Sequence, residues 1–180
     1  MAALVSALLI RLTDRSAGWT ASAAERSGKA GAVLASATIA LVVTHGIAAT
    51  AGWLVGQHIT DNPKRLMLGL ALLAAATGAA WPGKAKEPST GHLFLATLSH
   101  LISTGLGGRG EFVVFALAAG GTATLAAIGG FIGSMVILAA AVIAGEALWR
   151  PLPHRAIGWV VGLVLAATGI WLGLSAIRLI

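Results

Sequence analysis

The sequence alternates between long apolar runs and short breaks that contain Gly, Pro or charged residues. A transmembrane helix needs about 20 mostly apolar residues, and the runs lack the strict alternation of membrane-barrel strands. Since backbone polar groups in lipid must be satisfied within helices or closed barrels, the pattern predicts an all-α polytopic membrane protein with six transmembrane helices. The predicted spans are residues 2–24, 30–56, 66–81, 93–119, 122–149 and 157–180.

Composition supports this interpretation. Of the 180 residues, 57% are hydrophobic and 10% charged, whereas a soluble domain carries about 25% charged residues. An ordinary soluble enzyme, a disordered chain and a nucleic-acid binder of the basic-patch kind are therefore excluded. Without cysteine, the chain has no disulfide and no thiolate metal site.

Lys and Arg in the breaks predict the orientation, because cytoplasmic loops are richer in them. The breaks after the first, third and fifth spans hold six, and the opposite side holds three. We therefore expect a multi-pass protein of the cell (inner) membrane with both termini outside the cytoplasm. The six are Arg26, Lys29, Lys84, Lys86, Arg150 and Arg155, and the three are Lys64, Arg65 and Arg178.

The two halves of the chain share short matches in the same order, 90 to 94 residues apart. They pair residues 13–16 with 107–110, 63–65 with 153–155, and 75–78 with 166–169. Because each unit has an odd number of spans, the second must lie inverted relative to the first, as in many transporters. We expect a first three-helix repeat at 1–81, a cytoplasmic connection at 82–92 and a second three-helix repeat at 93–180.

Two segments carry a family resemblance. Residues 11–16 read Arg-Leu-Thr-Asp-Arg-Ser, and residues 105–110 read Gly-Leu-Gly-Gly-Arg-Gly. The layout resembles the Gdt family of the lysine-exporter superfamily, whose halves each carry Glu-x-Gly-Asp-Lys/Arg-Ser/Thr. This resemblance implies two three-helix halves and exchange of Ca²⁺ or Mn²⁺ for H⁺. Arg11, Gly105 and Gly108 stand where the family has acids, so the chain resembles a degenerate member of the family.

The candidate site consists of polar and glycine positions inside the predicted spans. An acid within a membrane helix is costly and indicates function by default, and carboxylate oxygens suit Ca²⁺ and Mn²⁺. Asp14 and Glu111 are therefore the candidate metal ligands. The candidate transport path comprises Arg15, Ser16, His45, Gly107, Gly108 and Arg109.

Each candidate also has a structural interpretation. Asp14 can pair with Arg11 one turn away, and Arg15 or Arg109 can either snorkel or pair with an acid of the other half. His45 can relay protons or be a packed, hydrogen-bonded histidine. The glycines at 105–110 favour close helix packing, and the alternative is a helix that is broken there. The structural interpretation of Glu111 is an acid at the end of a helix.

The function expected from these features is secondary transport resembling divalent cation–proton exchange. Two alternatives stay open: export of a small anionic or zwitterionic solute, and a non-transporting membrane subunit that has lost the motif acids. No arrangement typical of an enzyme occurs, and no cofactor or nucleic acid is expected. The expected partners are the lipid bilayer, a divalent cation with protons, and either a membrane subunit or a second copy of the chain.

Overall fold

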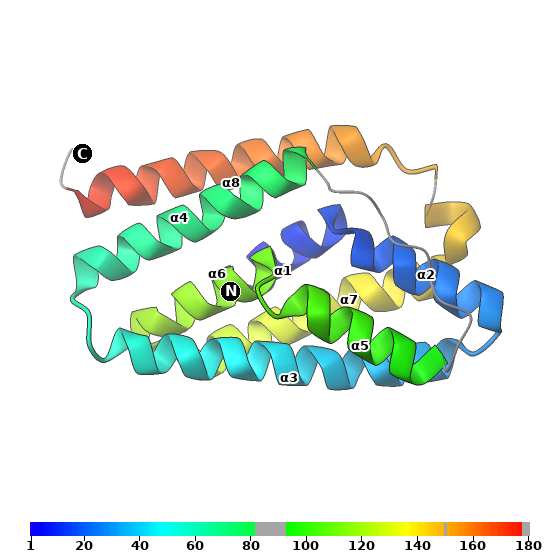
Figure 1. The fold of residues 1–180 in the computed structure, drawn as a ribbon. Coiled ribbons are helices and arrows are strands. Elements are labelled where there is room, and N and C mark those ends of the chain that lie inside the picture. The colour runs from blue at the N-terminus through cyan, green and yellow to red at the C-terminus, as the bar shows by residue number, and fades with distance from the viewer. Residues whose placement is uncertain (82–92, 150, 178–180) are drawn as a thin grey trace.

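The computed structural model describes residues 1–81, 93–149 and 151–177, and these contain helices and no strand (Figure 1). The expected connection at 82–92, with Lys84 and Lys86, lies outside the described residues, as do Arg150 and Arg178. The helices are α1 (Ala2–Thr13), α2 (Arg15–Ser27), α3 (Ala30–Gly56), α4 (Asp61–Ala80), α5 (Leu93–Gly105), α6 (Arg109–Leu117), the short π-helix η1 (Ala118–Thr122), α7 (Ala123–Trp149) and α8 (His154–Ala176). The predicted all-helical class is confirmed for this part of the chain.

Two of the predicted spans are broken in the middle. The first run divides into α1 and α2 at Asp14, whose backbone is extended (φ −86°, ψ 143°). The run from 93 to 119 divides into α5 and α6, where Gly107 has φ 89° and Gly108 is extended. A φ of this sign is readily adopted only by glycine. The glycine segment therefore breaks the helix, which was the less favoured of its two sequence interpretations.

Among the described residues, three helical stretches are long and apolar enough to cross a membrane: Ala30–Gly56, Arg109–Trp149 and His154–Ala176. The second stretch contains Gly121 with φ 94°, where the chain turns between α6 and α7. This turn lies in the gap between the predicted spans 93–119 and 122–149. Helix α4 begins with the charged residues Asp61, Lys64 and Arg65, which lower its apolar character. These features are typical of a helical membrane protein.

The helices lie roughly along one axis (Figure 1). The antiparallel α4 and α8 pack side by side as one layer, and α3 packs against α5, α6 and α7 on the other side. The half-helices α1 and α6 lie between these layers, and α1 also contacts α7. The two helix breaks therefore have packed helices on one side, while Arg15 at the first break and Gly107 at the second are exposed.

Close packing relies on glycine. A Cβ at Gly52 would collide with the carbonyl oxygen of Phe115, and one at Gly69 would lie 2.8 Å from the carbonyl oxygen of Gly169. Small residues let membrane helices approach closely, because burial of apolar surface gives little drive for association in lipid. Glycine therefore fixes the α3–α6 and α4–α8 contacts.

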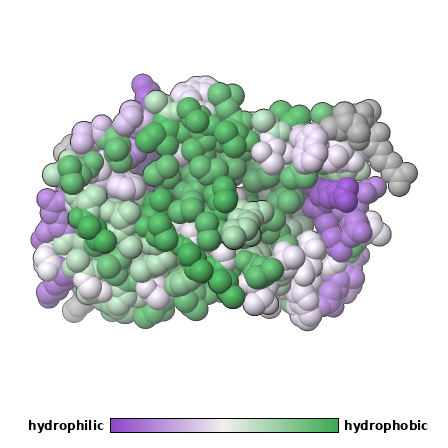
Figure 2. Space-filling model, turned by 180° about the vertical axis from the view of Figure 1, so that it is seen from behind, coloured by the Kyte–Doolittle hydropathy of each residue, from purple (hydrophilic) through white to green (hydrophobic). Residues whose placement is uncertain are grey.

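The face of the molecule shown in Figure 2 is apolar across its middle and hydrophilic toward its two ends. Large side chains such as Ile143, Leu125 and Leu163 are 83%, 69% and 66% exposed. Water-soluble monomers rarely expose contiguous apolar surface of this extent. Such a surface is typical of membrane proteins.

The glycine contacts predict a position-dependent cost within α3. Gly52→Ala should destabilise the protein by about 1–3 kcal/mol through overpacking, because Phe115 blocks the added methyl group. Gly46→Ala, in the same helix with open space at its Cβ position, should be neutral or mildly stabilising. Thermal unfolding of both variants in detergent measures this difference, and equal melting temperatures would contradict the α3–α6 contact.

Candidate functional site

The two helix breaks bring charged residues of distant segments into one buried cluster. Arg11 Nη1 donates to Asp14 Oδ2 at 3.2 Å and to Ser16 Oγ at 3.1 Å, and Arg11 Nη2 donates to Glu111 Oε1 at 3.1 Å. Ser16 Oγ in turn donates to Asp14 Oδ2 at 2.9 Å. One guanidinium therefore joins carboxylates from the two halves of the chain. We call Arg11, Asp14, Ser16 and Glu111 the central cluster.

The helix ends favour these charges. Arg11 lies in the last turn of α1 and Glu111 in the first turn of α6. A helix has partial negative charge at its C-terminus and partial positive charge at its N-terminus, so each residue sits at the end of complementary sign. Asp14 is the N-cap residue of α2, and its carboxylate bonds to Arg11 and Ser16 rather than to the helix backbone.

Burial distinguishes the two acids. The side chains of Arg11 and Glu111 are each 7% exposed, whereas that of Asp14 is 31% exposed. Buried ions are costly unless paired and hydrogen-bonded, so Arg11 and Glu111 form the inner pair. Asp14 is the carboxylate of the cluster that an ion from outside reaches most readily.

Two further helices extend the polar network. Thr44 of α3 places its hydroxyl 3.5 Å from Glu111 Oε1, and His45 Nδ1 lies 4.0 Å from the same oxygen. His45 Nδ1 is 3.0 Å from the Leu41 carbonyl oxygen, which accepts a hydrogen bond when Nδ1 is protonated. In that tautomer Nε2 accepts from Ser134 Oγ of α7, at 3.4 Å. The network thus links α1, α2, α6, α3 and α7.

Four of the predicted site residues meet here: Asp14, Ser16, His45 and Glu111. The Arg11–Asp14 pair, which the sequence offered as the structural interpretation of Asp14, is present. Arg11 also pairs with Glu111, across the two halves of the chain. The sequence had offered Arg15 and Arg109 as possible partners of these acids, with snorkelling as the alternative. Arg11 reaches both acids because it lies beside the break. The sequence indicated only its pairing with Asp14, through their spacing of three residues.

The remaining predicted residues lie around the cluster. Arg15 is exposed, and the Arg109 side chain packs against Gly78 of α4, with Nη1 buried and without a hydrogen-bond partner among the described residues. Gly107 provides the positive φ of the break. A Cβ at Gly108 would lie 2.5 Å from Glu111 Oε2, so this glycine makes room for the carboxylate.

Three residues of the polar network were not among the site residues predicted from the sequence: Arg11, Thr44 and Ser134. Thr44 and Ser134 lie in apolar helices where hydroxyl residues commonly bond to their own backbone, so the sequence holds no signal for their role. No group of three or more His, Cys, Asp or Glu that would hold a metal ion occurs among the described residues. The oxygens of the cluster instead surround a guanidinium.

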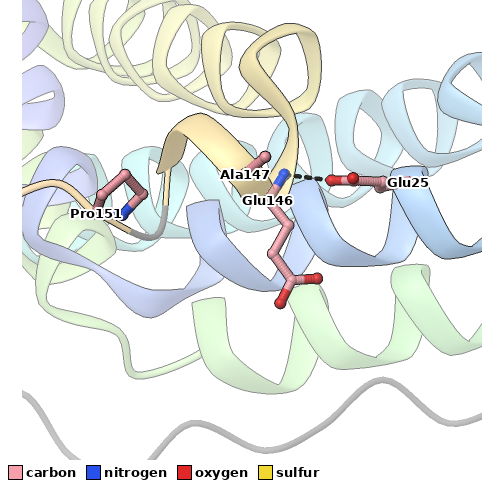
Figure 3. Close-up of a pocket in the computed structure, with 4 residues that line it drawn as sticks. All are labelled: Glu25, Glu146, Ala147 and Pro151. Atoms are coloured by element: carbon pink, nitrogen blue, oxygen red, sulfur yellow. Dashed lines mark hydrogen bonds between the residues drawn. The ribbon is translucent and has the colours of Figure 1, made fainter.

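A surface pocket of about 450 Å³ lies at the end of the molecule where α2 finishes (Figure 3). Its lining includes Glu25, Glu146, Ala147 and Pro151. The Glu25 carboxylate accepts a hydrogen bond from the backbone N–H of Glu146, beside the kink at Gly145. Glu146 Oε2 lies 3.9 Å from Arg26. This pocket contains none of the predicted site residues, and its acids hold the end of α7.

No family model, curated protein or solved structure matches the chain. These comparisons do not identify the Gdt family, so the resemblance stays an expectation from the sequence.

The central cluster predicts a large difference between two otherwise identical substitutions. Glu111→Gln leaves Arg11 without its inner partner, and breaking a buried pair typically costs about 3–5 kcal/mol. Glu146→Gln alters a more exposed pair, for which we expect a change of about 1 kcal/mol or less. Thermal unfolding in detergent tests this, and equal losses would show that Glu111 is not held in a buried pair.

Proposed function

We propose that the chain is an integral membrane secondary transporter, resembling divalent cation–proton exchangers, with the central cluster as its ion site. The observation that carries this proposal is the meeting of two broken helices at Arg11, Asp14 and Glu111. Discontinuous helices in transporters place their ends at the substrate and coupling-ion site. Ionisable groups inside membrane segments mark ion or proton pathways.

The proposed architecture has six crossing segments in two inverted halves. The order of two half-helices, a long helix and a further helix occurs twice: α1, α2, α3, α4 and then α5, α6 with η1, α7, α8. Packing supports the equivalence, because α1 contacts α7 as α5 contacts α3, and α2 contacts α7 as α6 contacts α3. In Figure 1, α1 and α2 run in the opposite direction to α5 and α6.

The halves differ in a way that fits alternating access. Helix α4 packs on α6, but no comparable packing joins α8 to α2 among the described residues. Arg109 is correspondingly packed against Gly78 while its counterpart Arg15 is exposed. In a transporter with inverted repeats, the two halves exchange such environments as the site opens to alternate sides. The asymmetry therefore supports a cycle between two states.

The proposed orientation places the α2–α3 and α7–α8 connections in the cytoplasm and the α3–α4 connection outside. Figure 1 shows the first two connections at one end of the molecule and the third at the other. Arg26, Lys29 and Arg155 belong to the first end, and Lys64 and Arg65 to the second. The larger number at the first end is in the direction that the positive-inside rule requires of the cytoplasmic side. The cell (inner) membrane and the outward termini belong to this proposal.

A second candidate function is export of a small anionic or zwitterionic solute. The buried Nη1 of Arg109 has no acceptor among the described residues, and an unsatisfied buried donor costs about 1–3 kcal/mol, more when charged. A solute carboxylate or phosphate would satisfy it. Arg109 lies on α6 two residues before Glu111, on a different face of the helix, so such a solute would bind beside Gly78 of α4 and not in the central cluster.

Orientation is tested with single cysteines, since the native chain has none. We expect an impermeant maleimide to label Gln57→Cys in intact cells, because the α3–α4 connection faces outward. Ala30→Cys, at the other end of α3, should be labelled only after permeabilisation. Both positions are exposed and uncharged. The reverse pattern would invert the topology, and equal labelling would contradict a crossing by α3.

Transport is tested by proton flux in proteoliposomes. We expect Mn²⁺ or Ca²⁺ gradients to drive proton movement, and Asp14→Asn to abolish it. The variant should remain folded, because Arg11 keeps Glu111 as a partner. Asp61→Asn, which alters an 88% exposed side chain, is the matched control and should transport normally.

Each other result selects an alternative. Flux that responds only to an organic anion would favour the exporter. Silence of the native protein until a membrane partner is added would favour the non-transporting subunit. Normal Mn²⁺ or Ca²⁺ exchange by a folded Asp14→Asn protein would remove Asp14 from the mechanism.

A further inference from the structure

The central cluster is already occupied by a cation that belongs to the protein. The Arg11 guanidinium contacts Asp14 Oδ2, Ser16 Oγ and Glu111 Oε1 within 3.1–3.2 Å. These three oxygens come from the first half-helix pair and from the second. A single positive group thus joins these oxygens of the two halves of the chain.

The same oxygens are suitable ligands for a free metal ion. Carboxylates and neutral oxygens are the preferred ligands of hard cations, and Thr44 Oγ1 lies 3.5 Å from Glu111 Oε1 as a further oxygen. A free cation and the guanidinium cannot share these atoms, because like charges at such separations repel strongly in a partly desolvated site. Binding of one requires departure of the other.

Arg11 lies beside a helix break and joins an outer carboxylate to an inner one. It is attached in the last turn of α1, directly before the extended residue that separates α1 from α2. Its Asp14 contact lies at the more exposed edge of the cluster, whereas Glu111 lies inside. An ion that reaches Asp14 first would compete with Arg11 for Asp14 before it competes for Glu111.

We infer that Arg11 is a tethered competitor for the cation site formed by Asp14, Ser16 and Glu111. The site accepts an external cation only when the guanidinium withdraws, so Arg11 holds the affinity for free cations low. The substrate class is a hard divalent cation with oxygen ligands. This inference rests on the proposed function, whose ion site it describes.

The test measures Mn²⁺ binding by the purified full-length protein in detergent, through titration calorimetry and through the Mn²⁺ dependence of the melting temperature. Arg11→Gln removes the competing charge and should bind Mn²⁺ at least about a hundredfold more tightly than the native chain, given the strength of charge repulsion at this distance. Because Arg11→Gln leaves Glu111 uncompensated, Mn²⁺ should also raise its melting temperature more than that of the native protein.

Three variants are the controls. Arg65→Gln removes the same charge from an exposed position on α4 and should leave Mn²⁺ affinity unchanged. Arg11→Lys keeps a tethered cation and should show little gain. The double variant Arg11→Gln with Glu111→Gln should lose the gain, because the inner carboxylate is then absent.

Several results would overturn the inference: unchanged Mn²⁺ affinity in folded Arg11→Gln, a gain that persists in the double variant, or an Arg11→Gln protein that does not fold even with Mn²⁺ present. These results are separable from failure of the proposed function. A gain in binding without proton-coupled flux in any variant would contradict transport alone. Mn²⁺-driven flux by the native chain without a gain in Arg11→Gln would contradict the tethered competitor alone.

Discussion

The buried contact of Arg11 with carboxylates from both halves is the interaction on which the centre of the molecule depends. A lone charge within a membrane helix is costly, and two acids beside one another would repel. The guanidinium removes both costs, since Nη1 and Nη2 reach different acids. Its planar, forked geometry suits two carboxylates better than a single ammonium does. The α1–α2 break and the α5–α6 break can therefore lie at the same place in the packed structure.

The helix breaks and the charges stabilise one another. An interrupted helix exposes unpaired N–H and C=O groups at its new ends, and the resulting partial charges need partners. Arg11 at the end of α1 and Glu111 at the start of α6 supply opposite charges at those ends. The breaks in turn give the ionised side chains a favourable electrostatic environment. Glycines complete the arrangement, because Gly107 makes the turn and Gly108 leaves space for Glu111.

Sequence alone predicted the helical class, the Arg11–Asp14 pair and the polar segments near 14 and 108. These features are local: apolar run length, i,i+3 spacing, and a charge or glycine inside an apolar run. The Arg11–Glu111 bond joins residues 100 positions apart, and no periodicity indicates which of three arginines meets which acid. The packing of Arg109 on Gly78 could not be predicted from the sequence either, because it depends on how closely α4 approaches α6. Tertiary approach decides the partners of long side chains, which have many rotamers.

The groups at the two helix breaks bear more on what this centre can do than the fold does. A fold accommodates many functions, and function depends on the groups at the site. At the breaks this chain carries Arg11, Arg15 and Arg109 against Asp14 and Glu111, so positive groups outnumber negative ones. A site with an excess of carboxylates attracts divalent cations directly. In the proposed mechanism, a cation binds here only after a positive group has moved away from these oxygens. Under this proposal Arg11 stabilises the two carboxylates and also competes with a metal ion for them.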